Sequence, residues 1–235
     1  MKKRQILRML SFLAALCIAA GCRGSTAVET TAGAGTQAET STVSEATTAA
    51  ESVSAEVEEL EVDHVDEDGI VYYKNPTEWT YEMVYEALTI EGKKVQAPLT
   101  FEDFGDKYSL HEETLTYFEK EKQVSLGIEY NGNKIGGITF VDCSSADDIK
   151  NKEINFLYLN LLQESSQLIF SDITVNKVGF YSTRDDIIKA LGVPYREVYY
   201  DGEVYSIAYK YKEKLSLVFV LNNNEVIEFY ILLND

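Results

Sequence analysis

The fold of this chain is decided by residues 182–233, which read STRDDIIKALGVPYREVYYDGEVYSIAYKYKEKLSLVFVLNNNEVIEFYILL. Ser182 or Thr183 can cap a helix with acidic residues in its first turn, and Gly192, with Pro194 beyond it, is expected to end that helix. Apolar and polar residues alternate along the rest of the stretch, which predicts half-buried strands. These strands are expected at 204–211, 215–221 and 225–233. Residues 182–233 therefore predict a helix followed by an antiparallel meander.

A similar pattern occurs in the first half of the folded region. Asn131-Gly132 separates two alternating stretches, at 123–130 and 134–141, and this dipeptide is the strongest local signal for a β-hairpin. Ahead of the hairpin, Thr100 can cap a short helix at 101–104.

Strands are also expected where the pattern is less regular. Residues 81–90 alternate large apolar side chains with acidic ones, and are expected to open the first half. In the second half, 153–162 and 168–175 are rich in apolar residues, although part of the first stretch could equally be helical. Together these features predict an α+β fold of two similar units, 70–148 and 149–235, each a short helix packed on an antiparallel β-meander.

Residues 1–21 have the features of an export signal. A cationic start is followed by an apolar run at 9–20 and by small residues before Cys22. The run is shorter than the roughly 20 residues that cross a bilayer as a helix, so a cleaved signal peptide is favoured over a membrane span. The sequence Ala19-Ala20-Gly21-Cys22 resembles the bacterial lipobox, with Ala19 where Leu is commoner. The resemblance implies that Cys22 is lipidated and anchors the protein at the extracytoplasmic face of the cell membrane. The alternative is an ordinary secretory signal followed by a chance cysteine.

Residues 22–69 are expected to carry the lipidated cysteine and a disordered acidic spacer. Up to Leu60 they consist almost wholly of Ser, Thr, Ala, Gly, Val and Glu, so they can bury too little apolar surface to fold. A flexible segment of this kind spans about 30–35 Å. Such a spacer would hold a folded domain clear of the membrane surface.

The composition is strongly acidic. The chain has 39 acidic and 21 basic residues and a formal net charge of −18. This charge repels phosphate backbones and anionic headgroups, so neither a nucleic-acid partner nor electrostatic docking to a membrane is expected. Cys17 lies in the signal, so only Cys143 remains for the folded part, where it is expected to be a buried side chain without a disulfide.

The second half resembles a known group of exported proteins. The residues that carry the likeness are the capped helix at 182–191, the exit Leu191-Gly192-Val193-Pro194, the tyrosine-rich strand at 205–211 and the apolar strands that close the chain. Residues 177–232 look like a unit of the β-lactamase-inhibitor-like folds and of the small outer-membrane-assembly lipoproteins. The resemblance implies a small helix packed on an antiparallel sheet, and leaves activity open.

The first half is similar to uncharacterised lipoproteins of Clostridia-type bacteria. The residues concerned are the strand and turn Thr89-Ile90-Glu91-Gly92, the short helix with Asp103-Phe104, and Asp142-Cys143 at the end of a strand. These motifs mark turns and caps, so the resemblance implies a fold and an address but no chemistry.

No catalytic residues, metal site or cofactor are expected. His64 and His111 stand far apart in the sequence, which argues against a zinc site. A calcium loop aligned on Gly69 fails, because His64 and Asn75 occupy its first and last ligand positions. Neither a nucleophile elbow nor a phosphate-binding loop is found. An envelope enzyme acting on glycans through paired carboxylates remains the alternative function.

Tyrosine is the distinctive residue, at 16 of 235 positions. The candidate ligand-binding residues are Tyr199, Tyr200, Tyr205, Tyr209 and Tyr211. The last three alternate along one strand and are expected to share a face, which would offer stacking platforms to a sugar, peptide or protein. The alternative is that they fill ordinary half-buried strand positions. The main hypothesis is a non-enzymatic lipoprotein that binds a protein or cell-wall ligand through a sheet face, and a further one is a role in assembling envelope complexes.

Overall fold

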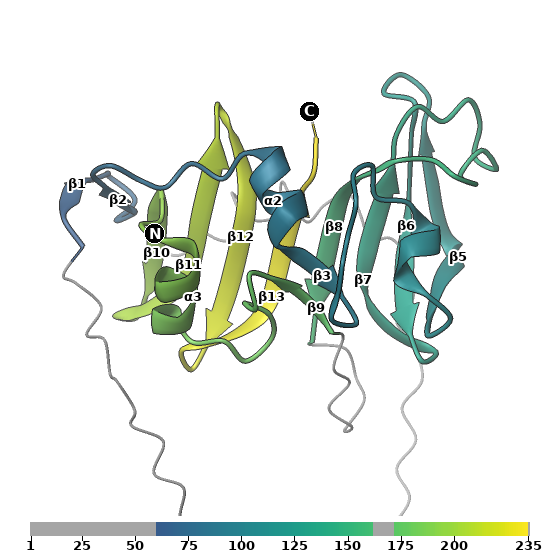
Figure 1. Ribbon diagram of the computed structural model, residues 1–235. Helices are drawn as coiled ribbons and strands as arrows, with labels where there is room; N and C mark the ends of the chain where they lie inside the picture. Colours follow the sequence, from purple (N-terminus) through teal and green to yellow (C-terminus); the bar gives the residue numbers. More distant parts are fainter. Residues whose placement is uncertain (1–59, 162–171, 235) are drawn as a thin grey trace, which may run out of the picture. The chain divides into compact units, whose positions relative to one another are not determined.

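The computed structural model describes residues 60–161 and 172–234 of the chain. Within these residues, main-chain hydrogen bonds build a ten-stranded antiparallel sheet and a three-stranded one, accompanied by two short α-helices and one 3-10 helix (Figure 1). The strand order of the large sheet is β1-β2-β10-β11-β12-β13-β8-β7-β6-β5, and that of the small sheet is β4-β3-β9. The predicted α+β class is confirmed in this broad sense.

The elements up to residue 161 are β1 (Val62–Val65), β2 (Val71–Tyr73), α2 (Tyr81–Ala87), β3 (Leu88–Ile90), β4 (Lys93–Lys94), the 3-10 helix η1 (Phe101–Phe104), β5 (Tyr108–Phe118), β6 (Gln123–Tyr130), β7 (Asn133–Phe140) and β8 (Ile154–Asn160). From residue 172 onward they are β9 (Ile173–Val175), α3 (Arg184–Leu191), β10 (Arg196–Tyr200), β11 (Glu203–Tyr211), β12 (Lys214–Asn222) and β13 (Glu225–Leu232).

The predicted helix and meander of the second half are confirmed. The Thr183 hydroxyl accepts a hydrogen bond from the main-chain N–H of Asp186, and the Asp186 carboxylate accepts one from the N–H of Thr183, so the two residues form a capping box. Gly192, with a φ of 84°, ends α3. β11, β12 and β13 pair in sequence order, and β10 adds a strand ahead of them.

The predicted hairpin of the first half is also confirmed. β6 and β7 pair across Asn131 and Gly132, whose φ angles are 50° and 76°. Positive φ at both central residues is what a two-residue type I′ turn requires, and Asn followed by Gly supplies it with little strain. The short helix η1 begins after Thr100, as predicted, with Asp103 completing its capping box.

The strand predicted at 81–90 is wrong for most of its length, because Tyr81–Ala87 form α2 and only Leu88–Ile90 form a strand. The Thr80 hydroxyl accepts a hydrogen bond from the N–H of Met83 at 3.2 Å and caps the helix. This cap outweighs the alternation of apolar and acidic residues that suggested a strand. Val84 is fully buried, whereas Met83 lies at the surface.

The expectations for residues 1–59, including the signal peptide, lipidation of Cys22 and most of the spacer, lie outside the described residues, as does 162–171. The end of the range expected to be spacer is ordered, because β1 pairs with β2. The Asp66 carboxylate accepts hydrogen bonds from the N–H groups of Asp68 and Ile70 in the turn, and the His64 ring stacks on Tyr72 with centroids 4.5 Å apart.

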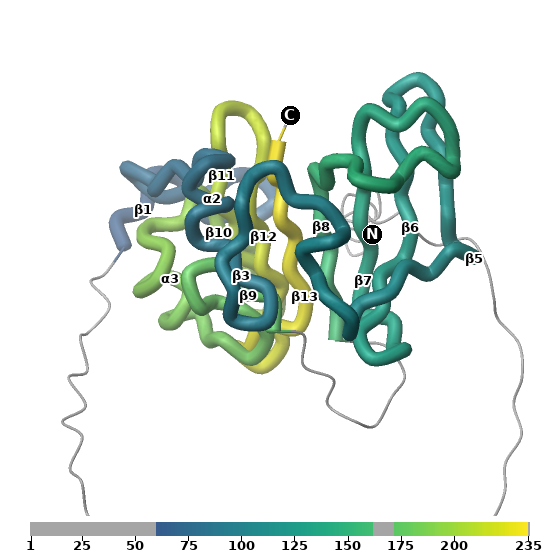
Figure 2. The backbone as a smooth tube through the Cα atoms, turned by 45° about the vertical axis from the view of Figure 1, so that its right-hand side comes forward, coloured from purple at the N-terminus to yellow at the C-terminus, as the bar shows by residue number. Residues whose placement is uncertain are grey.

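Helices α2 and α3 and the small sheet lie on one face of β10–β13, here called the inner face (Figures 1 and 2). Trp79, ahead of α2, donates from Nε1 to the Leu191 carbonyl of α3 at 2.9 Å, and its ring meets Tyr209 of β11 edge-on. Along one register, fully buried side chains of four strands form the core beneath them: Ile207, Phe219, Phe229 and Leu159. In each of these strands, a residue adjacent to the core residue points to the opposite, outer face. These residues are Ala208, Val218, Tyr230 and Tyr158.

The two meanders meet where β13 pairs with β8 (Figure 1). Tyr230 lies directly opposite Tyr158 in this antiparallel pair. In the small sheet, Thr89 of β3 lies opposite Thr174 of β9, and their hydroxyl oxygens are 2.8 Å apart. β8 and β13 are about 70 residues apart in the sequence, and their pairing forms the middle of the outer face.

Candidate functional site

The five tyrosines predicted to bind a ligand do not share one surface. Tyr199 and Tyr200, at the end of β10, are exposed over 40% and 65% of their area. Tyr209 is fully buried, and its hydroxyl donates to the Gly192 carbonyl at 2.9 Å. The expectation that Tyr209 contacts a ligand is therefore wrong, because this side chain belongs to the core under α3.

A register shift explains why Tyr205 does not share a face with Tyr209 and Tyr211. In the β10–β11 pairing, Val198 lies opposite Ser206 and Tyr199 lies opposite Val204, so Tyr205 is an extra residue in β11. An extra residue in one strand re-aims the side chains around it. Tyr205 stands near the charge of Glu228 on β13, whereas the half-buried Tyr211 lies at the other end of β11. There it meets Tyr81 of α2 edge-on, with ring centroids 5.2 Å apart.

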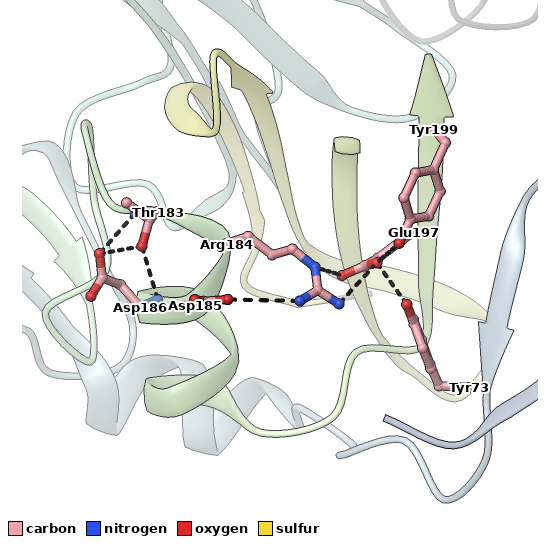
Figure 3. Close-up of polar contacts among 7 residues, drawn as sticks. All are labelled: Tyr73, Thr183, Arg184, Asp185, Asp186, Glu197 and Tyr199. Atoms are coloured by element: carbon pink, nitrogen blue, oxygen red, sulfur yellow. Dashed lines mark hydrogen bonds and ion pairs between the residues drawn. The ribbon is translucent and has the colours of Figure 1, made fainter. Parts of the chain in front are cut away.

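A buried carboxylate on the inner face joins α3 to the sheet (Figure 3). Glu197 of β10 has no exposed surface. Arg184, the first residue of α3, donates from Nε to Oε1 at 2.9 Å and from Nη2 to Oε2 at 3.3 Å. The hydroxyl groups of Tyr73 and Tyr199 donate to Oε2 at 2.6 and 2.8 Å. Four donors on one carboxylate satisfy the charge that burial would otherwise leave unpaired.

The electrostatics of this network favour a structural role. Burial alone would lower the pKa of Arg184, but the hydrogen bonds and charge of Glu197 outweigh it and raise that pKa. Burial, followed by the Glu197 carboxylate, raises the pKa of Tyr73 well above its ordinary value, so its phenol remains a donor. Because the donors converge on Glu197, the network ties α3, β2 and β10 together.

A second cluster, on the outer face, has different properties. We call it the Glu228 cluster, and its members are Phe156, Tyr158 and Asn160 of β8, Tyr205 of β11, and Glu228 and Tyr230 of β13, all of them half-buried. The Tyr158 and Tyr230 rings stack with centroids 4.9 Å apart and an interplanar angle of 19°. Phe156 lies 6.2 Å from Tyr230, so three rings from two strands form one aromatic patch.

The carboxylate of Glu228 is held within this patch. The Tyr230 hydroxyl donates to Oε1, and Asn160 Nδ2 donates to Oε2 at 3.0 Å. Asn160 Nδ2 also lies 2.6 Å from the Tyr158 hydroxyl, which itself hydrogen-bonds to Glu228. Burial raises the pKa of Glu228 even though hydrogen bonds from Tyr230 and Tyr158 act in the opposite direction.

The phenols around Glu228 respond to the same environment. Burial first, and then the Glu228 carboxylate, raise the pKa of Tyr230 well above its ordinary value. The same two causes raise the pKa of Tyr205. The cluster therefore surrounds one carboxylate with aromatic rings, an arrangement suited to binding and orienting a ligand.

The residues of the Glu228 cluster other than Tyr205 were missed as candidates from the sequence. Phe156, Tyr158 and Asn160 occur in one alternating stretch, and Glu228 and Tyr230 in another, but nothing local shows that the two stretches pair. The signal that the sequence offers is that each stretch has a tyrosine two positions from a polar residue, and therefore on the same face of its strand. These pairs are Tyr158 with Asn160 and Tyr230 with Glu228. Only the β8–β13 register brings them together.

The described residues give little support to metal or thiol chemistry. Among residues 60–161 and 172–234, no three His, Cys, Asp or Glu side chains are grouped so that they could hold a metal ion. Cys143 is buried, and burial raises the pKa of its thiol, which disfavours the reactive thiolate. His111 contacts Glu129, with Nδ1 2.8 Å from Oε1, on the edge strand β5 and its neighbour β6.

No known family, curated protein or solved structure matches this chain. In the part of the chain that the structure describes, no helix is long and apolar enough to cross a membrane. Function must therefore follow from the geometry and chemistry of the site itself.

Proposed function

We propose that the protein is a lipid-anchored binding protein at the extracytoplasmic face of the cell membrane, which binds a protein or cell-wall ligand through the Glu228 cluster. The observation that carries this proposal is the cluster itself, where aromatic rings surround a half-buried carboxylate on the outer face. A half-buried carboxylate with a raised pKa destabilises the fold at neutral pH. Groups of this kind concentrate at functional sites.

We also propose that the folded region consists of two similar units that meet at this cluster. The strand order supports the division, because β5-β6-β7-β8 of one half mirrors β10-β11-β12-β13 of the other about the β8–β13 pair. In both sheets, a strand that precedes residue 162 pairs with a strand that follows residue 171. Tyr158 lies opposite Tyr230 in the large sheet, and Thr89 lies opposite Thr174 in the small one. On this division the boundary falls after β8 rather than at 148/149.

The helices give independent support for two units. η1 begins with a capping box of Thr100 and Asp103, and α3 begins with one of Thr183 and Asp186, in each case shortly before a strand that pairs with the next. The helices differ in length, because Gly105 ends the first after a single turn. The Glu228 cluster would then be built by both units, as binding sites at domain junctions often are.

Hydrolysis of glycans by paired carboxylates is the alternative function. That chemistry needs two carboxyl groups about 5–10 Å apart on either side of the scissile bond. Among residues 60–161 and 172–234, the side chains that hydrogen-bond to Glu228 are the neutral ones of Tyr230, Tyr158 and Asn160. This composition supports binding over hydrolysis.

The anchor is tested by replacing its cysteine. We expect the native protein to fractionate with membranes and its N-terminal residue to carry a diacylglyceryl mass, because a thioether at Cys22 is the proposed attachment. Cys22→Ser removes the thiol, so this variant is expected to lose the lipid mass and leave the membrane fraction. Cys143→Ser is the matched control and should remain membrane-bound. An unmodified N-terminus in the native protein would contradict the anchor.

The binding face is tested by partner capture from the cell envelope. With Tyr230→Ala we expect at least about tenfold less captured partner than with the native protein, because aromatic side chains at the centre of an interface carry much of its binding energy. Tyr200→Ala is the control, since Tyr200 is the more exposed of the two tyrosines at the end of β10 and lies outside the cluster. Thermal unfolding of both variants checks that each is folded. Equal capture by Tyr230→Ala and the native protein would remove the outer face as the binding site.

A further inference from the structure

We infer that the Glu228 cluster receives a lysine side chain from a basic segment of a partner protein. This inference rests on the proposed function, because it names the chemistry of the ligand bound at the same site. The occupant that we infer is a protein segment, and the cluster that receives its lysine is built across β8, β11 and β13 on the broad face of the sheet.

The composition of the cluster matches a protonated amine. Phenol rings attract a cation over their faces, and a carboxylate among the rings adds the opposite charge. Tyr158 and Tyr230 stack beside each other, and Phe156 continues the aromatic surface along β8. The four methylene groups of a lysine stem can pack on such rings while the ammonium group reaches the carboxylate.

Hydrogen bonding within the cluster strengthens the attraction. The Tyr230 hydroxyl donates to Oε1 of Glu228, and the Tyr158 hydroxyl hydrogen-bonds to the same carboxylate. A phenol whose hydrogen is held by a carboxylate carries more negative charge on its ring, because linked hydrogen bonds polarise one another. The rings that face the ligand are therefore better partners for a cation than isolated tyrosines.

Charge complementarity favours a basic partner over a neutral or acidic one. The chain carries 39 acidic and 21 basic residues, so its long-range field attracts cations and repels anions. Burial raises the pKa of Glu228 in the free protein, and a bound ammonium group would stabilise the ionised form. A neutral oligosaccharide would gain nothing from this field.

The test uses the processed chain, residues 22–235, carrying Cys22→Ser, with tetralysine as the probe in calorimetry at low ionic strength. We expect Glu228→Gln to weaken tetralysine binding about tenfold, because the cation loses its counter-charge among the rings. Glu225→Gln is the matched control, since it removes the same charge from the exposed start of β13 and should change binding less than about twofold. Tyr230→Phe keeps the ring but loses the hydrogen bond to Oε1 of Glu228, so its affinity should fall less than that of Glu228→Gln. Thermal unfolding confirms that each variant is folded.

Three results would overturn the inference. Equal losses in Glu228→Gln and Glu225→Gln would mean that net charge alone attracts tetralysine. Equal affinity for choline and tetralysine would mean that the site takes a small free cation rather than a peptide segment. Binding of the neutral oligosaccharide chitotetraose, lost in Tyr230→Ala, without binding of tetralysine, would replace the basic segment by a glycan and leave the proposed function standing. Failure of the proposed function itself has a different signature, which is unchanged capture of envelope partners by Tyr230→Ala.

Discussion

Glu197→Ala is expected to lower the free energy of unfolding by about 3–5 kcal/mol, because breaking a buried ion pair leaves its other partner without a counter-charge. Glu197 has no exposed surface, and it accepts hydrogen bonds from Arg184, Tyr73 and Tyr199. All of these donors lose their acceptor together. For a folded region of this size the loss corresponds to a fall in melting temperature of roughly 10–15 °C, measurable by calorimetry or circular dichroism.

Two further variants separate the unpaired charge from lost packing. Asp185→Ala is the control for Arg184, since Asp185 lies 3.7 Å from Nη1 and its side chain is 71% exposed, and it should change stability by less than about 0.5 kcal/mol. The double variant Arg184→Met, Glu197→Ala keeps the same gap at position 197 but removes the guanidinium charge, and it is expected to be more stable than Glu197→Ala. If the double variant is no more stable, the effect of Glu197→Ala arises from packing rather than from the unpaired guanidinium.

The elements predicted correctly from the sequence are those specified by neighbours in the chain. Thr183 and Gly192 mark the ends of α3, and Asn131-Gly132 marks the β6–β7 turn, because caps and tight turns depend on a few adjacent residues. The same reasoning should have identified α2, since Thr80 is a cap three residues ahead of Met83. A helix of only seven residues is too short to show its own period clearly, so the alternation of Tyr81–Ala87 resembles that of a strand.

The sites escaped prediction because they depend on contacts between distant segments. Glu197 is a charged residue between Arg196 and Val198, and nothing in this stretch of sequence shows that it is buried. Its burial follows only from the packing of α3 on β10. Tyr205 leaves the face of Tyr209 because β11 carries an extra residue at this point, which sequence alternation cannot show. The Glu228 cluster requires β13 to pair with β8, whose residues precede it by about 70 positions.

The β8 side of that cluster depends on a glycine in the neighbouring strand, and Gly136→Ala is expected to destabilise the protein by about 3–4 kcal/mol. Gly136 of β7 lies opposite Leu159 of β8 and has a φ of 156°. A Cβ atom there would lie 1.8 Å from the Tyr158 carbonyl oxygen and 2.9 Å from the Leu159 Cα. Both contacts are with main chain, so the strands must separate and no side chain can yield instead.

The matched control for Gly136→Ala is Gly132→Ala in the β6–β7 turn. Gly132 has a φ of 76°, but its Cβ would meet nothing within 4 Å, so this substitution adds only backbone strain of about 1 kcal/mol. Denaturant unfolding should therefore rank the native protein first, Gly132→Ala second and Gly136→Ala last. Because Tyr158 shares the displaced main chain, Gly136→Ala should also weaken partner capture while Gly132→Ala preserves it. Equal stability of the two variants would mean that β7 and β8 do not pair in this register, and the alignment of Tyr158 with Tyr230 would then lose its support from β7.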